Sequence, residues 1–220
     1  TEAVPVFTAE DPLRILVVGD SLAVMMGYGL MRQAETNPAL KVDMITKVSS
    51  GLSRPDFYNW PKVMKEATVK YHPDVVVIHF GGNDKQPIRT QGKALESFST
   101  AWKTEYYLRI WAFLDIITEA GGEAIWMGLP IMRGEKFSET CRTLNAMYSA
   151  TCEHVRGATY VDGYALFQDE QGKYNAYLVD STGQRRLMRA DDGIHFSNAG
   201  GDRQAEAVMK VLVESYRLEP

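Results

Sequence analysis

Apolar runs that alternate with amphipathic segments constrain the fold of this chain more than any other feature. The runs are short, and the first of them is continuous and rich in Ile and Val, which is typical of a buried strand. They occupy residues 14–18, 42–48, 74–80, 123–129 and 159–161. Helical patterns occupy residues 22–35, 60–71, 97–120, 138–155 and 199–216. This alternation predicts an α/β fold, with a parallel sheet covered by helices on both faces.

The length of the chain is typical of one domain. Its 220 residues are 45% apolar, which is enough for a large core. We expect residues 1–12 to be an extended lead-in and residues 13–220 to form the domain. Residues 163–190 interrupt the alternation and predict a small β insertion. Its short strand-like runs are residues 166–169, 174–179 and 185–189. This insertion either roofs a ligand cleft or acts as an arm that fixes the loop after it.

The composition disfavours several classes of partner. The formal net charge is −4, from 24 basic and 28 acidic residues, which disfavours a nucleic-acid surface. No block of Lys and Arg indicates an anionic lipid surface, and no apolar stretch approaches the ~20 residues of a membrane span. No cluster of His, Cys and carboxylates has metal-ligand spacing, so we expect no metal and no other cofactor. The oligomeric state stays open.

The two cysteines, Cys141 and Cys152, fall on one predicted helix. In a straight helix they lie ~16 Å apart at a rise of about 1.5 Å per residue. A disulfide needs Cα atoms within ~7 Å. We therefore interpret both cysteines as small core residues rather than as a disulfide.

Ser21 ends the first predicted strand and opens the first predicted helix. In α/β sheets this position, at the carboxyl end of a strand, is where ligands bind. The hydroxyl would point into a crevice, with helix N–H groups nearby to stabilise negative charge. Two interpretations fit this segment alone: a nucleophile, or a helix N-cap, which is a position that serine favours.

Asp192 and His195 supply what a nucleophilic serine needs. A base takes the proton of the serine, and a carboxylate orients and stabilises that base. The two residues lie three apart in the predicted loop before the last helix, where one turn can direct both toward one point. Asp191 is an alternative carboxylate, although the spacing to His195 favours Asp192. Without Ser21, a turn with a surface histidine would be the preferred interpretation.

Asn83 and Gly51 are candidates for holding negative charge on a substrate. Gly81-Gly82-Asn83-Asp84 follows a strong predicted strand, and its glycines let the backbone approach a ligand. The Asn83 amide is a donor suited to an oxyanion, although a Gly-Gly-Asn turn has the same pattern. Gly51 follows another predicted strand and offers its N–H as a second donor.

Together and in this order, the four segments resemble the SGNH, or GDSL, hydrolase family. The blocks that match are Gly19-Asp20-Ser21-Leu22, Gly51, Gly81-Gly82-Asn83-Asp84 and Asp192-Gly193-Ile194-His195. The resemblance spans residues 13–216. Residues 51–61 also resemble a bacterial branch of the family that is associated with the cell envelope.

The resemblance implies a fold and a mechanism. The fold is a three-layer α/β/α sandwich with a five-stranded parallel sheet, the flavodoxin-like fold of these hydrolases. Ser21 would attack an ester carbonyl, His195 would transfer the proton, and Asp192 would hold the imidazole tautomer. The oxyanion would be held by the N–H groups of Ser21 and Gly51 and by the Asn83 side chain. The location that the resemblance implies is the bacterial periplasm or the cell exterior.

Four further side chains near predicted strand ends are candidate contacts for a polar or acidic substrate, and each also fits a surface charge: Arg54, Asp56, Lys85 and Arg133. We expect a serine esterase that removes short acyl groups, acetyl above all, from an envelope or extracellular carbohydrate. The alternatives are acyl transfer to a glycan hydroxyl, a lipase or thioesterase, and a non-catalytic carbohydrate-binding domain. The four matched blocks argue against the last of these.

Overall fold

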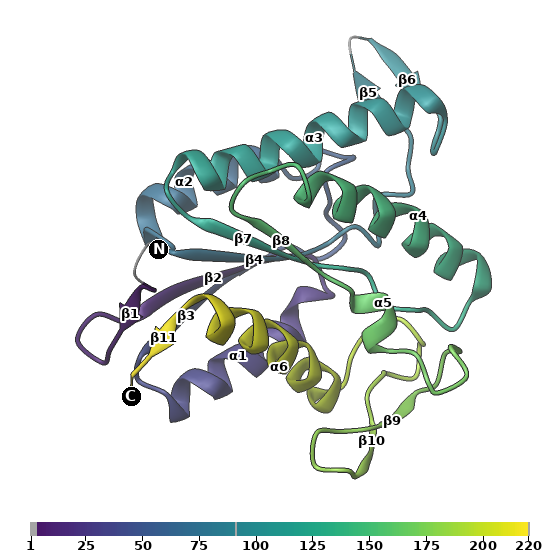
Figure 1. Ribbon diagram of the computed structural model, residues 1–220. Helices are drawn as coiled ribbons and strands as arrows, with labels where there is room; N and C mark the ends of the chain where they lie inside the picture. Colours follow the sequence, from purple (N-terminus) through teal and green to yellow (C-terminus); the bar gives the residue numbers. More distant parts are fainter. Residues whose placement is uncertain (1–3, 91, 220) are drawn as a thin grey trace.

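The computed structural model describes residues 4–90 and 92–219, and at its centre lies a five-stranded parallel sheet (Figure 1). In sheet order the strands are β3 (Leu40–Thr46), β2 (Leu13–Gly19), β4 (Val75–His79), β7 (Glu123–Met127) and β8 (Ala158–Val161). These are the five predicted strands. The order places β2 and β4, which carry the Ser21 and Asn83 loops, side by side.

Helices cover both faces of this sheet (Figure 1). On one face lie α1 (Ala23–Thr36) and α6 (Asn198–Ser215), which pack against each other. On the other face lie α2 (Trp60–Tyr71), α3 (Thr100–Glu119) and α4 (Glu135–Cys152). The predicted three-layer α/β/α sandwich is therefore confirmed, with helix bounds that differ from the prediction by a few residues.

Alternate side chains of β2 point into two separate cores, as the two-residue period of a strand requires. Ile15 and Val17 pack with α1 and α6, whereas Leu16 and Val18 pack with the helices of the opposite face. All four side chains are almost completely buried. A strand with apolar residues on both faces reads as a continuous apolar run, which is the pattern that the sequence shows.

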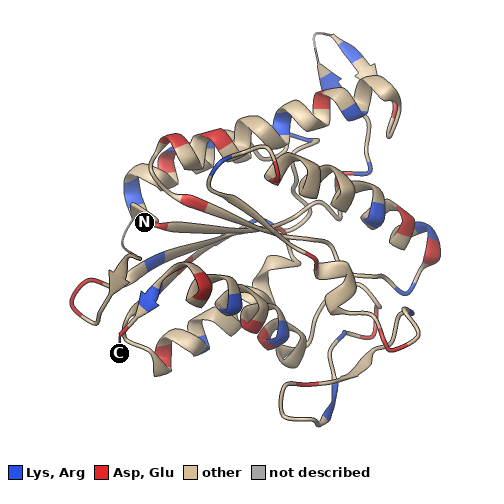
Figure 2. Cartoon of the chain, in the orientation of Figure 1, with Lys and Arg blue, Asp and Glu red and all other residues tan. Residues whose placement is uncertain are grey.

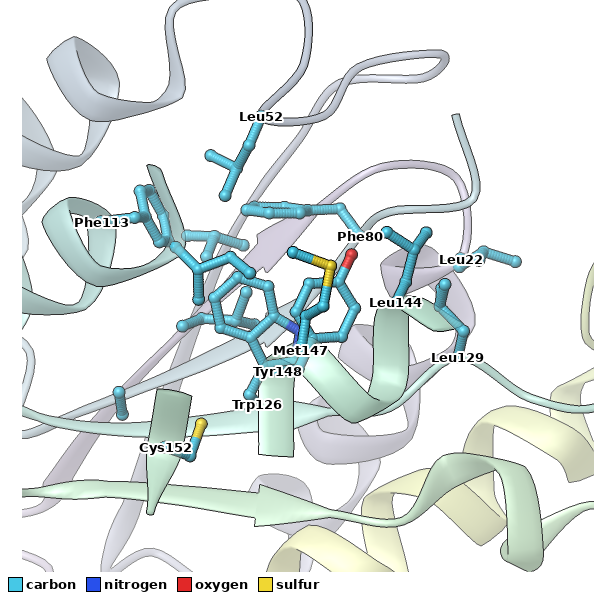
Figure 3. Close-up of a cluster of buried hydrophobic side chains, with 14 of the residues drawn as sticks. Leu22, Leu52, Phe80, Phe113, Trp126, Leu129, Leu144, Met147, Tyr148 and Cys152 are labelled. Carbon is cyan, nitrogen blue, oxygen red and sulfur yellow. The ribbon is translucent and has the colours of Figure 1, made fainter. Parts of the chain in front are cut away.

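The core on the α2, α3 and α4 face is built on aromatic rings (Figure 3). Trp126 stacks on Tyr148 with 4.5 Å between ring centroids, and Phe80 meets Trp126 edge-on at 5.4 Å. Leu22, Leu52 and Phe80 belong to this core and follow β2, β3 and β4 respectively. The core therefore anchors the three loops that leave the carboxyl ends of these strands.

The segment 163–190 is only partly β structure. It contains the one-turn helix α5 (Gly163–Leu166) and an antiparallel pair, β9 (Tyr177–Val179) and β10 (Arg185–Leu187). The strand predicted at residues 166–169 does not form: Leu166 is the last residue of α5, and of the following three only Gln168 pairs, in an isolated antiparallel bridge with Tyr174. The Asp162 carboxylate accepts hydrogen bonds from the amides of Tyr164 and Ala165, both at 3.0 Å, and this N-cap starts a helix instead.

Two further pairs of short strands have no counterpart in the prediction. One is the antiparallel hairpin of β5 (Ile88–Thr90) and β6 (Lys93–Leu95). The other joins β1 (Val6–Phe7) in parallel to β11 (Arg217–Leu218), and the Phe7 ring meets Tyr216 edge-on at 5.5 Å. The described part of the expected lead-in is thus held against the other end of the chain, while residues 1–3 lie outside the described residues.

Acidic and basic side chains are interspersed over the helices and loops (Figure 2). Cys141 and Cys152 are buried and free, as the helical spacing predicts. Among the helices that the structure describes, none has both the length and the apolar character needed to cross a membrane.

Candidate active site

Ser21 lies in the sharp turn between β2 and α1. Only glycine fits before this turn, since a Cβ on Gly19 would lie 2.1 Å from the carbonyl oxygen of His79 on β4. Asp20 turns inward, and its Oδ1 accepts a hydrogen bond from the Leu22 amide at 2.8 Å. Leu22 occupies the N-cap position of α1. The capping interpretation of Ser21 therefore does not hold.

Ser21, His195 and Asp192 form one chain of hydrogen bonds. Ser21 Oγ lies 2.8 Å from His195 Nε2, and His195 Nδ1 lies 2.5 Å from Asp192 Oδ2. Asp192 Oδ1 accepts from the amides of Ile194 and His195 at 2.8 and 2.9 Å. Burial alone would raise the pKa of Asp192, but these hydrogen bonds lower it to about 2. Because Asp192 is a carboxylate, Nδ1 carries the hydrogen and Nε2 faces Ser21 as an acceptor.

The groups expected to hold an oxyanion lie in the loops after β2, β3 and β4. Within residues 4–90 and 92–219, the amides of Ser21 and Gly51 have no hydrogen-bond acceptor. Asn83 Nδ2 donates to Asp20 Oδ2 at 3.0 Å and to the Ser50 carbonyl at 3.2 Å. Both Asn83 hydrogens are thus engaged, so an oxyanion would share one of them with the protein.

Asp84 is fully buried and holds the loop after β3. Its carboxylate accepts from the amides of Leu52 and Ser53 at 2.9 and 2.7 Å and from the Tyr106 hydroxyl at 2.6 Å. A Cβ on Gly51 would lie 2.3 Å from Asp84 Oδ1, so only glycine fits there. Burial raises the pKa of Asp84. Asp84 thus positions Gly51, which the motif match alone does not reveal.

Asp20 is the second fully buried carboxylate of the site. Besides the Leu22 amide, it accepts hydrogen bonds from Asn83 Nδ2 and, at 3.4 Å, from the Gly81 amide. Burial raises the pKa of Asp20 to about 7. Asp20 therefore joins the loop of Ser21 to the loop of Asn83.

Ser21 and His195 open onto a cavity of about 260 Å³. Apolar and polar side chains both contribute to its wall, which consists of Asp20, Ser21, Leu22, Val48, Ser49, Gly82, Asn83, Lys85, Phe137, Ile194 and His195. Lys85 is thus placed in the cavity wall, and its Nζ lies 4.1 Å from the centroid of the Phe137 ring. In the part of the chain that is described, no group of three or more His, Cys, Asp or Glu side chains could hold a metal ion.

The other three candidate contacts do not line this cavity. Arg54 and Asp56 form an ion pair with each other, with 2.7 Å between Arg54 Nη2 and Asp56 Oδ2. Arg133 Nη1 donates to the carbonyl of Asp191 at 2.7 Å, so it contacts the loop of the proposed base. Asp192, rather than Asp191, is the carboxylate that reaches His195.

Arg189 is a residue of the site that the sequence analysis missed. It lies at the end of a strand-like run, and its side chain is fully buried. It donates to the carbonyl of Ile194 at 2.8 Å, next to His195. One sequence feature could have indicated Arg189. It follows Met188 at the end of a mostly polar strand-like run, directly before the loop that carries Asp192.

Comparison with known proteins gives a family and a fold. Residues 14–211 match the family model described as "Protein of unknown function (DUF459)". No curated protein matches the chain. Many solved structures do match it.

Three of these structures illustrate the likeness. A candidate SGNH hydrolase from Slackia heliotrinireducens is 18% identical with a TM-score of 0.62, and the match covers 90% of this chain and 98% of that one. An acetylxylan esterase from Geobacillus stearothermophilus, solved as a catalytic mutant, is 15% identical with a TM-score of 0.62, covering 96% and 95%. A GDSL-like lipase from Bacteroides thetaiotaomicron is 11% identical with a TM-score of 0.63, covering 96% and 92%. At identities this low, the likeness is one of fold.

Proposed function

The chain belongs to the DUF459 family and has the fold of SGNH hydrolases, and on that premise we propose that it is a serine esterase acting on short acyl esters. The observation that carries this proposal is the hydrogen-bonded chain from Ser21 through His195 to Asp192, at 2.8 and 2.5 Å. A serine whose only hydrogen-bonding partner among the described side chains is a histidine, itself held by a carboxylate, is arranged for nucleophilic attack.

The proposed reaction proceeds in two halves. Ser21 Oγ attacks the ester carbonyl carbon, and His195 Nε2 takes the hydroxyl proton. The oxyanion accepts hydrogen bonds from the amides of Ser21 and Gly51, with Asn83 as a third donor. The tetrahedral intermediate then collapses, and His195 gives its proton to the departing alcohol oxygen. Water then attacks the acyl-Ser21 ester with His195 as base, and the second tetrahedral intermediate releases the carboxylic acid while His195 returns its proton to Ser21 Oγ.

The proposed substrate is a short acyl ester, acetyl above all, on an envelope or extracellular carbohydrate. The small cavity beside Ser21 favours a short acyl group. One solved relative of the same fold is an acetylxylan esterase, which is consistent with a carbohydrate ester. Lys85 in the cavity wall is suited to a polar or anionic part of that substrate. The location outside the cytoplasm rests on the resemblance of residues 51–61 to envelope-associated relatives.

The test is a series of p-nitrophenyl esters of increasing acyl length, with the wild-type chain and Ser21→Ala measured side by side. We expect rates that fall with acyl length and a loss of at least ~10³-fold in Ser21→Ala. Ser149→Ala, on α4 and outside the cavity wall, is the matched control and should keep the wild-type rate. Retained hydrolysis in Ser21→Ala would contradict the proposal.

Product analysis distinguishes hydrolysis from acyl transfer, because it shows whether water or a glycan hydroxyl accepts the acyl group. With an acetyl donor and an added glycan, a hydrolase releases acetate at the rate at which the donor is consumed. Acetylated glycan in the products would instead assign the chain to acyl transfer, with the same Ser21 chemistry. Rates that rise with acyl length would assign it to lipase or thioesterase activity.

A further inference from the structure

Arg189 is a buried arginine without a carboxylate partner. Its side chain is fully buried, and among the described residues no Asp or Glu lies within ion-pair distance of it. Burying an unpaired charge is costly unless other groups satisfy its donors. Burial lowers the pKa of Arg189 to about 10, so the guanidinium stays charged at neutral pH. The hydrogen-bond acceptors around the Arg189 guanidinium must therefore account for its burial.

The donors of Arg189 are satisfied by main-chain carbonyls from two loops. Nη1 donates to the carbonyl of Ile131, in the loop after β7, at 2.5 Å. Nη2 donates to the carbonyl of Ile194 at 2.8 Å and reaches that of Gly193 at 3.4 Å. Nε reaches the carbonyl of His195, also at 3.4 Å. One guanidinium thus spans three consecutive carbonyls of the loop that carries His195.

Aromatic rings enclose the same guanidinium. Its central carbon lies 4.9 Å from the ring centroid of Phe196, 5.4 Å from Tyr174 and 5.7 Å from Phe167. Cations attract aromatic ring faces, and the attraction grows when water is excluded. Phe167 and Tyr174 belong to the segment 163–190, so the contact joins this segment to the His195 loop.

Arg189 also lies where the two ends of that loop meet. Arg189 and Phe196 pair as an isolated antiparallel bridge, and the Ala190 amide donates to the His195 carbonyl at 2.9 Å. The residues between them belong to no helix or strand. The loop is therefore held by a few main-chain hydrogen bonds and by side chains, of which Arg133 contacts the Asp191 carbonyl and Arg189 contacts the carbonyls of residues 193–195.

We propose that Arg189 is a positioning residue for His195, and that the segment 163–190 serves the reaction by bracing the His195 loop rather than by roofing the cleft. This inference rests on the proposed function of Ser21 and His195. The wall of the cavity beside Ser21 supports it, because that wall contains no residue of the segment 163–190.

Arg203 provides a matched control. It too donates to main-chain carbonyls, with Nε 2.7 Å from the carbonyl of Leu166 and Nη1 2.7 Å from that of Val179. These bonds attach the segment 163–190 to α6 but do not reach the His195 loop. A purely structural role would make Arg189→Ala and Arg203→Ala alike, whereas a positioning role separates them.

The first readout is kinetic, with p-nitrophenyl acetate as substrate. We expect Arg189→Ala to lower kcat by ~10- to 100-fold with little change in KM, because a displacement of about 1 Å at a catalytic group costs up to ~10²-fold. Ethylguanidine, which fits the vacated site, should restore part of kcat in Arg189→Ala and have no effect on Arg203→Ala. Equal losses in the two variants, or no rescue, would overturn the proposal.

The second readout needs no turnover. The Nδ1 proton of His195, held by Asp192, gives a downfield proton resonance that is assigned by its absence from His195→Gln. We expect it in the wild type and in Arg203→Ala, and we expect it to be lost or broadened in Arg189→Ala. A resonance that is unchanged in Arg189→Ala would overturn the proposal even if kcat fell.

The two readouts separate the failure of this inference from the failure of the proposed function. If the wild type hydrolyses no ester, the esterase proposal fails, while the resonance still tests whether Arg189 holds His195. If Arg189→Ala does not fold, Arg189→Lys takes its place. Lysine keeps the charge but cannot span three carbonyls, so the same loss of kcat and of the resonance is expected. A Lys variant with wild-type values would count against the proposal.

Discussion

The two halves of the candidate site are held by opposite chemistry. In the half that would bind the oxyanion, the buried carboxylates of Asp20 and Asp84 accept hydrogen bonds from N–H and O–H groups of the loops after β2, β3 and β4 and of α3. In the half that carries His195, the buried guanidinium of Arg189 donates to loop carbonyls. Buried carboxyl oxygens accept from N–H and O–H donors in the first half, whereas a buried guanidinium donates to carbonyl acceptors in the second.

The halves also differ in depth. Asp20 and Asp84 are fully buried at the end of the sheet, beside the aromatic core. The side chains of His195 and Asp192 remain 42% and 44% exposed. The oxyanion half is therefore part of the folded core, whereas the base half is a surface loop held from beneath. Substitutions in the first half should affect stability and rate together, whereas substitutions of the exposed His195 and Asp192 side chains should affect mainly the rate.

Removing one reacting group from each half gives the largest expected effect. His195→Ala should lower kcat/KM by ~10²–10⁴-fold, which is the usual contribution of a general base, and leave the free energy of unfolding almost unchanged. Asn83→Ala should lower kcat by up to ~10²–10³-fold and also destabilise the fold, since Asn83 links Asp20 to Ser50. Ester kinetics and urea unfolding measure both. A large loss in the free energy of unfolding of His195→Ala would contradict the claim that the exposed half contributes little to stability.

Removing the Asp84 carboxylate tests the claim that the oxyanion half belongs to the core. Asp84→Ala leaves the donors of Leu52, Ser53 and Tyr106 without their acceptor, so we expect a loss of ~3–5 kcal/mol in the free energy of unfolding. Tyr106→Phe removes one of these donors and should cost about 1 kcal/mol. Urea denaturation measures the free energy of unfolding of the wild type, Asp84→Ala and Tyr106→Phe. Similar losses in both variants would show that Asp84 does not hold the loop.

The pH dependence of the free energy of unfolding tests whether Asp20 is protonated in the folded protein. Burial raises the folded-state pKa of Asp20 to about 7, whereas an unfolded Asp titrates near ~4. The folded protein therefore binds more protons than the unfolded chain between these values, and the free energy of unfolding falls as pH rises from about 4 to about 7.

Asp20→Asn should flatten this slope without removing it, because burial also raises the pKa of Asp84. The measurement is urea unfolding at several pH values across that range. The amide introduced by this substitution would face the Asn83 amide, donor against donor, so the ester hydrolysis rate should fall as well. An unchanged slope would mean that Asp20 is ionised in the folded protein.

The smallest expected effect concerns Lys85 at the rim. Lys85→Met should lower the preference for an anionic over a neutral ester by about two- to fivefold, since an exposed ion pair contributes ~0.2–1 kcal/mol. The matched esters are 3-acetoxybenzoate and 3-acetoxybenzamide, compared by kcat/KM. Arg54→Met is the control, because Arg54 is already paired with Asp56. Equal preference ratios in the wild type and Lys85→Met would remove Lys85 from substrate recognition.

The central strands β2, β4 and β7 could be predicted because each carries a nearly continuous run of buried apolar residues, and the long helices because each has one apolar side. The hairpin of β5 and β6 escaped prediction because its strands are short and partly exposed, so they carry no clear period. The strand predicted at residues 166–169 is lost at its first residue, because the Asp162 cap starts a helix that ends at Leu166, and it is reduced to one isolated bridge at Gln168. The type of a long element can therefore be predicted from its apolar period, whereas a short element depends on single side-chain contacts.

The candidate site divides in the same way. The motif spacing brought Ser21, His195 and Asp192 to attention, and the structure places them in hydrogen-bonding contact. The spacing says nothing of the acceptors that occupy both Asn83 hydrogens, because those acceptors lie in two other loops. Arg189 escaped prediction because its place before the Asp192 loop is a weak signal, and the main-chain carbonyls that it binds are common to every residue type.

The pairing of β1 with β11 has a practical consequence for handling the protein. These strands hold both ends of the described chain together (Figure 1) near the start of β7, where the Tyr216 hydroxyl donates to Glu123, whereas Ser21 follows the carboxyl end of β2. A chain immobilised on a resin through either of these ends would keep the cavity beside Ser21 facing away from the resin, so coupling there should cost little access to bulky polymeric esters. Trimming residues 4–8 for the same purpose would uncover Tyr216 and is the less suitable design.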